Sequence, residues 1–160
     1  MVTFGLLTDP LNAVPAEIQK FSELGFDYVE IGIEEPSATP GILLEQKEQI
    51  IEMLDKYKLF PIGHTAYWVQ FGTLHEKARR GWIAEAKIMI DISRELGIKL
   101  LNFHFHIGYG RTPESTSDFM RYTKNFTESM SELTNYAENQ KLTLMLENIP
   151  IKLKEGKVIT

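Results

Sequence analysis

Polar side chains of types that commonly bind metals or substrates lie at the ends of three apolar segments. They are His64, Tyr67, His104, His106, Glu147 and Asn148. In α/β proteins the functional groups gather at the carboxyl ends of parallel strands, so these residues are expected to meet at one rim. Histidine nitrogen and glutamate oxygen suit Zn²⁺, Mn²⁺ or Fe²⁺. The pattern therefore predicts a divalent metal site.

Glu147 carries the strongest of these signals. It ends the apolar run 142–146, where an ionised carboxylate is costly unless it is paired or bound to a metal. A single histidine in an apolar strand is more often a hydrogen-bonded core residue, but His64 follows Gly63 and precedes a turn, which weakens that alternative. Glu30 lies within another apolar segment, where it either faces the interior or caps the next loop.

Three histidines and one arginine leave alternatives open. His104 and His106 are two residues apart and face the same side of a strand at different depths, so only the upper one would contact a ligand directly. Arg111 lies in the glycine-rich loop 108–113, where it either holds an anionic group of a substrate or is simply exposed. His75 precedes a long helical stretch and is expected to be a surface or capping residue.

Five short apolar segments alternate with longer helical patterns. Strands are predicted over residues 2–8, 28–33, 60–67, 100–106 and 142–147. Helices are predicted over residues 16–24, 42–57, 76–96 and 117–139, with Ser117 as the last N-cap and with Leu24 and Leu44 in the apolar stripes. This alternation indicates βαβ units and a parallel sheet. A flavodoxin-like open sheet and part of a barrel both fit it, and the polar strand ends favour the barrel.

The composition is that of a globular protein. The 160 residues suit a single domain over 1–160, and 43% of them are hydrophobic. The absence of cysteine excludes disulfides and thiolate metal sites. No apolar run is long enough to cross a bilayer and no secretory signal begins the chain, so we expect a cytoplasmic protein with no membrane partner. The net charge of −5 argues mildly against nucleic-acid binding without excluding it.

Three segments resemble the xylose isomerase-like TIM barrel superfamily. Residues 142–150 resemble its fifth strand, an apolar run closed by Glu-Asn, and residues 25–31 resemble its Gly-aromatic-Asp-x-Val-Glu signature at the second strand. The block from His64 to His104 resembles endonuclease IV-type enzymes of the superfamily. The resemblance implies a (β/α)₈ barrel present as about five βα units. A complete barrel has about 200 residues or more, so we expect the N-terminal part of one.

The resemblance also assigns roles to residues. Glu147 matches a metal ligand, and His64 matches a ligand or substrate contact on the third strand. On the fourth strand, His104 takes the ligand position by register with Leu-Leu-Asn-Phe-His, whereas His106 takes it by the family's His-x-Gly ending. We favour His106, which is expected to lie nearer the rim. Residues expected to contact substrate are Glu30, Tyr67, Asn148 and Arg111. The family's remaining ligands on the sixth to eighth strands have no counterpart in the chain.

These roles predict a metal-dependent isomerase or epimerase acting on a sugar or sugar phosphate. A divalent metal (Mn²⁺, Mg²⁺ or Zn²⁺) would bind the small-molecule substrate, and Glu147 would act as the catalytic carboxylate in proton abstraction next to a carbonyl. Two departures from the endonuclease branch favour sugar chemistry. The first strand carries Gly5-Leu6-Leu7-Thr8 in place of Gly-x-His, and the fifth ends in Glu-Asn-Ile-Pro rather than Glu-Asn-Thr.

Two other functions compete with this prediction. The first is an endonuclease IV-type enzyme that cleaves phosphodiesters at abasic sites with a zinc cluster. The second is a non-catalytic partial barrel that binds a ligand or self-associates. Five strands of an incomplete barrel leave open edges at the first and fifth strands, and open edges invite pairing, so a homo-oligomer is expected in that case.

Overall fold

The computed structural model describes residues 2–105, 115–148, 151–152 and 158–159, and the side chains of residues 2–105 and 115–147. The main sheet has parallel strands in the order β1-β2-β3-β4-β5. These strands are β1 (Gly5–Leu7), β2 (Tyr28–Ile33), β3 (Phe60–Thr65), β4 (Leu100–Phe105) and β5 (Thr143–Asn148). A separate antiparallel pair, β6 (Ile151–Lys152) and β7 (Val158–Ile159), was not predicted from the sequence.

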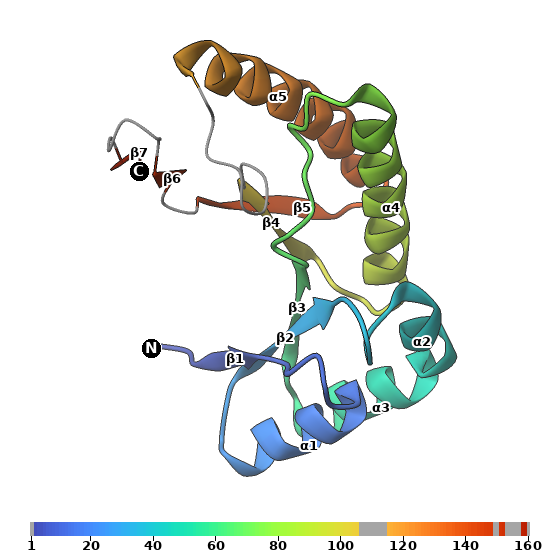
Figure 1. Ribbon diagram of the computed structural model, residues 1–160. Helices are drawn as coiled ribbons and strands as arrows, with labels where there is room; N and C mark the ends of the chain where they lie inside the picture. The colour runs from blue at the N-terminus through green and yellow to red at the C-terminus, as the bar shows by residue number, and fades with distance from the viewer. Residues whose placement is uncertain (1, 106–114, 149–150, 153–157, 160) are drawn as a thin grey trace.

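The helices form a single layer on one side of the main sheet (Figure 1). They are α1 (Val14–Glu23), α2 (Pro40–Glu45), α3 (Lys47–Tyr57), α4 (Glu76–Glu95) and α5 (Thr116–Glu138). A flavodoxin-like sheet carries helices on both faces and has the strand order 2-1-3-4-5. The sequential order and the single helical layer instead show βα units of a TIM barrel, which confirms the barrel prediction. No helix in the described part of the chain is long and apolar enough to cross a membrane.

The two faces of the main sheet have different environments because successive side chains of a strand alternate between them. On β2, Val29, Ile31 and Ile33 are fully buried beneath the helices. The intervening residues Glu30 and Gly32 therefore face the side without helices, which is the interior side of the barrel. The hydrophobic core thus lies between the sheet and its helices, and the interior side carries Glu30 beside its apolar register partners Leu7 and Ile62.

The loop after β3 is anchored in this core by an aromatic side chain. Phe71 is almost fully buried, and its ring centroid lies 5.3 Å from that of Phe103 on β4 and 6.5 Å from that of Phe126 on α5. Such tilted and edge-to-face pairs stabilise a core beyond their buried area. The loop that leaves the end of β3 is therefore fixed to the following βα units.

Two predicted apolar stripes are wrong in detail. The helix predicted over 42–57 is two helices, α2 and α3, because Gln46 adopts a non-helical conformation between them. The short α2 presents Leu43 to the core, and Leu44 is exposed. Leu24 is also exposed because it caps the C-terminus of α1, where the chain leaves the helix.

Each of the two long helices, α4 and α5, is capped at its N-terminus by a side chain that accepts a backbone hydrogen bond. The N-cap of α5 is Ser115 rather than the predicted Ser117, and its Oγ accepts a hydrogen bond from the backbone N–H of Asp118 at 3.2 Å. The N-cap of α4 is His75, whose Nδ1 accepts from the backbone N–H of Ala78 at 3.4 Å. The expectation that His75 is a capping residue at the surface is therefore confirmed.

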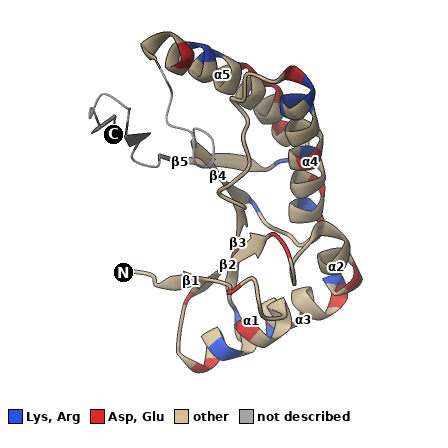
Figure 2. Cartoon of the chain, in the orientation of Figure 1, with Lys and Arg blue, Asp and Glu red and all other residues tan. Residues whose placement is uncertain are grey.

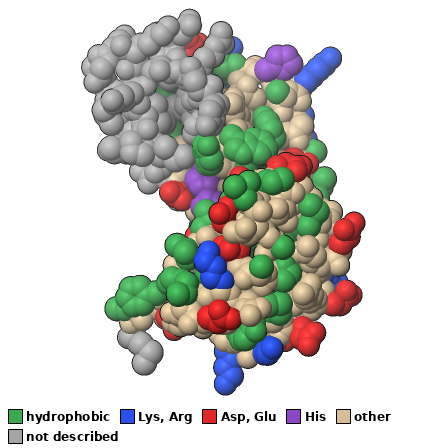
Figure 3. All heavy atoms as spheres, turned by 60° about the horizontal axis from the view of Figure 1, so that its bottom comes forward, with side chains coloured by type: hydrophobic (Ala, Val, Ile, Leu, Met, Phe, Trp, Pro, Cys, Tyr) green, Lys and Arg blue, Asp and Glu red, His purple; other side chains and the backbone are tan. Residues whose placement is uncertain are grey.

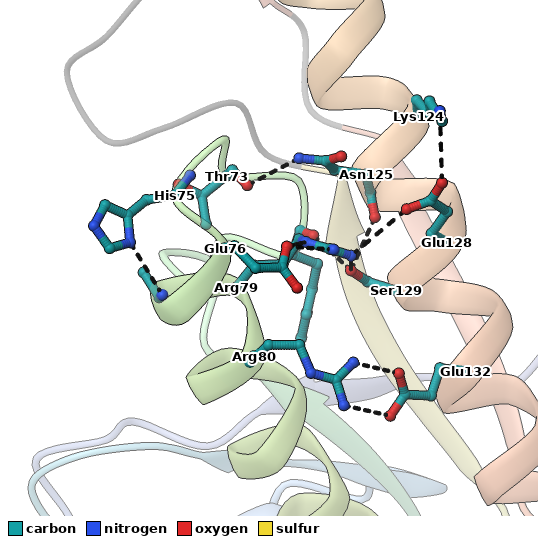
Figure 4. Close-up of polar contacts among 12 residues, drawn as sticks. Thr73, His75, Glu76, Arg79, Arg80, Lys124, Asn125, Glu128, Ser129 and Glu132 are labelled. Carbon is teal, nitrogen blue, oxygen red and sulfur yellow. Dashed lines mark hydrogen bonds and ion pairs between the residues drawn. The ribbon is translucent and has the colours of Figure 1, made fainter.

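Ion pairs connect α4 to α5 along their exposed sides (Figure 4). Arg80 contacts the Glu132 carboxylate with both terminal nitrogens, at 2.6 Å and 3.3 Å. The Nζ of Lys87 lies 2.8 Å from the same carboxylate. Deeper between the helices, Arg79 donates to the Oγ of Ser129 at 3.3 Å. These contacts fix the two helices that pack behind β3, β4 and β5.

Replacing Glu132 by Gln is expected to change the pH dependence of stability. Hydrogen bonds from Arg80 and Lys87 lower the pKa of the Glu132 carboxyl to about 2. A carboxyl with a lowered folded-state pKa stabilises the protein above its unfolded pKa of about 4.5 and loses that effect as pH falls towards the folded value. The free energy of unfolding of the wild type at pH 7 should therefore exceed that of Glu132→Gln. The difference should be about 1 kcal/mol or less, because solvent screens ion pairs between exposed side chains.

Urea unfolding at pH 7 and at pH 3 measures this difference. We expect it to shrink at pH 3, where the carboxyl is already protonated in the unfolded chain. Glu138→Gln is the matched control, since Glu138 is exposed on the same helix and makes no ion pair with a described residue. A difference between wild type and Glu132→Gln that does not vary with pH would contradict the assignment.

Candidate metal centre

Three potential metal ligands meet on the interior side of the sheet, one from each of three neighbouring strands. His104 of β4 is the register partner of Glu147 of β5, and His64 of β3 is the partner of Asn102, two residues before His104. Register partners on parallel strands face the same side, so the strands alone place His64, His104 and Glu147 together. One ligand atom from each of the three lies within 4.8 Å of the others.

The geometry of this cluster fits a divalent cation. The Nε2 of His104 lies 3.5 Å from Oε2 of Glu147, and the centroids of the two imidazoles are 4.7 Å apart. Two ligands on a tetrahedral ion with bonds of about 2.1 Å are themselves about 3.4 Å apart. Two histidine nitrogens and one carboxylate oxygen form a donor set that leaves further coordination positions open. The residues present therefore suit a metal that also binds a substrate.

Glu30 orients the imidazole of His64. Its Oε1 lies 2.8 Å from Nδ1 of His64, and both side chains are partly buried. A carboxylate that accepts the Nδ1 proton fixes the tautomer in which Nε2 carries a lone pair. This is the usual support of a metal-binding histidine. The structure thus places Glu30 behind His64, and its expected contact with substrate stays a prediction.

Asn102 supports Glu147, a contact that the sequence analysis missed. The Nδ2 of Asn102 donates to Oε2 of Glu147 at 3.0 Å. Asn102 is largely buried within an apolar strand, on the same face as His104. A buried amide needs a hydrogen-bond partner, so its position two residues before His104 was the signal that could have identified it.

Glu147 is more exposed than the apolar sequence of its strand suggests. Its side chain is 54% exposed, whereas that of His104 on the same side of the sheet is 5% exposed. Most charged residues lie on the helices and loops, and the strands are largely uncharged (Figure 2), so charge on Glu30 and Glu147 is exceptional. Figure 3 shows histidine side chains reaching the surface beside acidic side chains. Within the described part of the chain, the Glu147 side of the centre is therefore accessible to a ligand from solvent.

Four further residues were predicted to belong to the site, and the structure describes the side chain of one of them, Tyr67. Tyr67 follows the end of β3 and is 45% exposed. Asn148 is the last residue of β5 and pairs in register with Phe105, and its side chain lies outside the described residues. His106 and Arg111 also lie outside the described residues. Within the described part of the chain, His104 is the fourth-strand histidine that the structure brings to His64 and Glu147.

Comparisons with known proteins agree on the fold. The family described as xylose isomerase-like TIM barrel matches residues 18–155. Fructoselysine 3-epimerase of Shigella flexneri is 30% identical to this chain over the matched region. The match covers 97% of this chain and 56% of that protein. The crystal structure of a D-tagatose 3-epimerase-like protein matches 93% of this chain and 54% of its own, with a TM-score of 0.77 and 22% identity.

A metal-bound structure is also similar. The IOLI protein with a bound zinc atom has a TM-score of 0.73 and 18% identity, over 92% of this chain and 52% of its own. At these identities the similarity of the solved structures shows the fold alone. The chain spans about half the length of the relatives that it matches.

Proposed function

The chain belongs to the xylose isomerase-like TIM barrel family, and from that premise we propose that it acts in a metal-dependent sugar epimerase or isomerase. The observation that carries the proposal is the cluster of His64, His104 and Glu147 at the strand ends. Support also comes from the 30% identity to a fructoselysine 3-epimerase and from the fold shared with a D-tagatose 3-epimerase-like protein. The substrate would be a small sugar or sugar derivative with a carbonyl group.

In this proposal the cluster holds the metal through the Nε2 atoms of both histidines and an oxygen of Glu147. A divalent cation bound there supplies positive charge that polarises a carbonyl and stabilises the negative charge that develops on its oxygen. Mn²⁺, Mg²⁺ and Zn²⁺ are the candidate ions for this donor set. Glu30 keeps the His64 imidazole in place through its 2.8 Å contact with Nδ1.

Glu147 is proposed as the proton-transferring group. Asn102 and His104 lie against its Oε2, at 3.0 Å and 3.5 Å, so this oxygen is held in position. The side chain is half exposed, which leaves the other oxygen open to a substrate. That oxygen would take a proton from the carbon next to the carbonyl, and reprotonation of the same carbon from its opposite face would give the epimer. Tyr67, Asn148 and Arg111 are proposed to contact the substrate around it.

Charge at the strand ends favours a sugar over a nucleic acid. The loops that follow β1, β2 and β3, over residues 8–13, 34–39 and 66–75, contain Asp9, Glu34 and Glu35 and no lysine or arginine, and residues 108–113 after β4 contain the single cation Arg111. Cleavage of a phosphodiester duplex relies on cationic side chains that neutralise phosphates. The endonuclease alternative is therefore not favoured. Self-association through the edges of β1 and β5, predicted for a non-catalytic partial barrel, stays a prediction.

Hydrogen exchange at carbon tests the proposed reaction. The purified protein is incubated in D₂O with Mn²⁺ and a panel of ketoses that includes fructoselysine, and deuterium at the carbon next to the carbonyl is followed by NMR. We expect deuterium incorporation together with epimer formation, and its loss on adding a chelator. Exchange that a chelator leaves unchanged, or incision of an abasic-site duplex in place of exchange, would contradict the proposal.

A further inference from the structure

A further carboxylate, that of Glu34, lies on the interior side of the sheet and outside the metal cluster. Glu34 directly follows β2, and it is partly buried. A Cβ added to Gly32 would lie 3.6 Å from Oε1 of Glu34, and it would face the interior side because Gly32 lies between two residues buried beneath the helices. No described residue forms an ion pair or a hydrogen bond with this carboxylate. Its oxygens are therefore available to a ligand.

The hydroxyl of Thr8, at the end of β1, borders the same space. Its Oγ1 would lie 3.5 Å from a Cβ added to Gly32, and it accepts a hydrogen bond from the backbone N–H of Gly32 at 3.0 Å. A threonine hydroxyl both accepts and donates, so its proton is left for a further acceptor. The interior side of Gly32 is thus bordered by one group that accepts hydrogen bonds and by one that donates them.

The loops that carry these two groups are fixed to each other. The backbone N–H of Ser37, in the loop after β2, donates to the carbonyl of Pro10, in the loop after β1, at 3.2 Å. From α1, the buried carboxylate of Glu17 accepts a hydrogen bond from the backbone N–H of Asp9 at 3.2 Å. The two oxygens beside Gly32 are therefore held in position before a ligand binds, which lowers the entropy cost of binding.

These oxygens lie on the opposite side of the metal centre from Glu147, the proposed base. Gly32 is the register partner of His64 on β3, and Glu147 lies two strands further along the sheet, on β5. Neighbouring strands are about 4.8 Å apart. A ketose whose carbonyl lies at the metal therefore has the remainder of its carbon chain within reach of Glu34 when that chain extends towards β2.

We propose that Glu34 and Thr8 together bind a hydroxyl group of the sugar on a carbon remote from the carbonyl. A hydroxyl donates one hydrogen bond and accepts others, so it satisfies the carboxylate and the threonine hydroxyl at once, whereas an ammonium group cannot accept and a carbonyl cannot donate. Glu34 is thereby a specificity-determining residue that selects long, hydroxylated ketoses. The inference rests on the proposed function, because it places the carbonyl at the metal.

Relaxation of sugar protons by bound Mn²⁺ measures binding at the metal centre without turnover. The Mn²⁺-loaded protein is titrated with D-fructose and with dihydroxyacetone, and saturation of the relaxation effect gives the affinity for each. Both probes offer the metal a carbonyl flanked by hydroxyl groups, but only D-fructose has further hydroxylated carbons that reach towards β2. A contact at Glu34 therefore changes the affinity for D-fructose alone.

Glu34→Gln should weaken D-fructose binding about tenfold or more and leave dihydroxyacetone binding unchanged, because it removes a charged hydrogen-bond acceptor. Glu35→Gln is the matched control, since it removes the same charge from the next residue, which is exposed, and both affinities should stay the same. In exchange assays, Glu34→Gln should raise the KM for D-fructose and leave kcat unchanged. Unchanged D-fructose affinity in Glu34→Gln would overturn the proposal.

Gly32→Ala tests the space itself. The added methyl group should weaken D-fructose binding because it occupies the space beside the two oxygens. The variant should fold, since the new Cβ would contact its neighbours at 3.5 Å or more. Thermal unfolding and the Mn²⁺ affinity should therefore match those of the wild type. Full D-fructose affinity in Gly32→Ala would contradict a ligand at this place.

Failure of this inference differs from failure of the proposed function. Saturable binding of both probes with no effect of Glu34→Gln would reject the hydroxyl contact and leave the sugar chemistry standing. Binding of neither probe to the Mn²⁺-loaded protein would reject both. A loss of D-fructose and dihydroxyacetone binding by the same factor in Glu34→Gln would assign Glu34 to the metal centre and overturn its role as a remote contact.

Discussion

Glu147→Gln is expected to slow carbon-bound proton exchange by about 10³-fold or more, the largest effect of any single substitution in the chain. The amide cannot accept the substrate proton, and general-base groups contribute about 10²–10⁴-fold on their own. The variant also loses a charged oxygen from the cluster with His64 and His104, so metal affinity should fall as well. Deuterium incorporation and metal titration are measured on the same preparation, which separates the two effects.

Two comparisons sharpen this prediction. Glu147→Asp keeps the charge but withdraws it by one methylene, so it should retain more metal affinity than Glu147→Gln while exchange remains slow. Glu138→Gln removes an exposed carboxylate on α5 and should leave exchange unchanged. If Glu147→Gln at saturating metal exchanges the substrate proton as fast as wild type, another group is the base.

The strands were the most predictable part of the fold. The predicted strand 28–33 has the same bounds as β2, because its β-branched residues Val29, Ile31 and Ile33 alternate with Glu30 and Gly32, which is the period of a strand. The break at Gln46 was not predictable from periodicity, since an apolar stripe continues through it with only a shift from Leu44 to Leu43. The decision between a barrel and an open sheet also required strand order, which no local pattern encodes.

The candidate site also has a part that the sequence predicts and a part that only the structure shows. Strand ends pointed to His64 and Glu147, because the type and position of those residues are visible in the sequence. The supporting contacts, from Glu30 to His64 and from Asn102 to Glu147, cross between strands 34 and 45 residues apart. Their formation depends on register, and a shift of one residue would send each side chain to the other face. The sequence therefore predicts a substrate contact for Glu30, and the contact that the structure shows is with His64.

The place of His64 in the cluster, with Glu30 behind it, leads to a second prediction with a large expected effect, on metal affinity. His64→Ala removes one of three clustered ligands and should weaken binding of Zn²⁺ or Mn²⁺ by more than about 100-fold, since losing the supporting partner alone typically lowers affinity about 10–100-fold. Glu30→Gln keeps an acceptor for Nδ1 but loses the negative charge that strengthens this contact, so its loss of metal affinity should fall in that lower range. Isothermal titration of each purified variant gives both values.

The double variant decides how Glu30 acts. If Glu30 works only by orienting His64, adding Glu30→Gln to His64→Ala should weaken metal binding no further, because the partner through which it acts is gone. Gln140→Ala is a control, since Gln140 is partly buried but lies in the α4–α5 contact region, and it should leave metal affinity unchanged. Additive losses from Glu30→Gln and His64→Ala would show that Glu30 contacts the metal itself. A loss confined to sugar affinity would instead restore Glu30 to the substrate-binding role that its sequence position suggested.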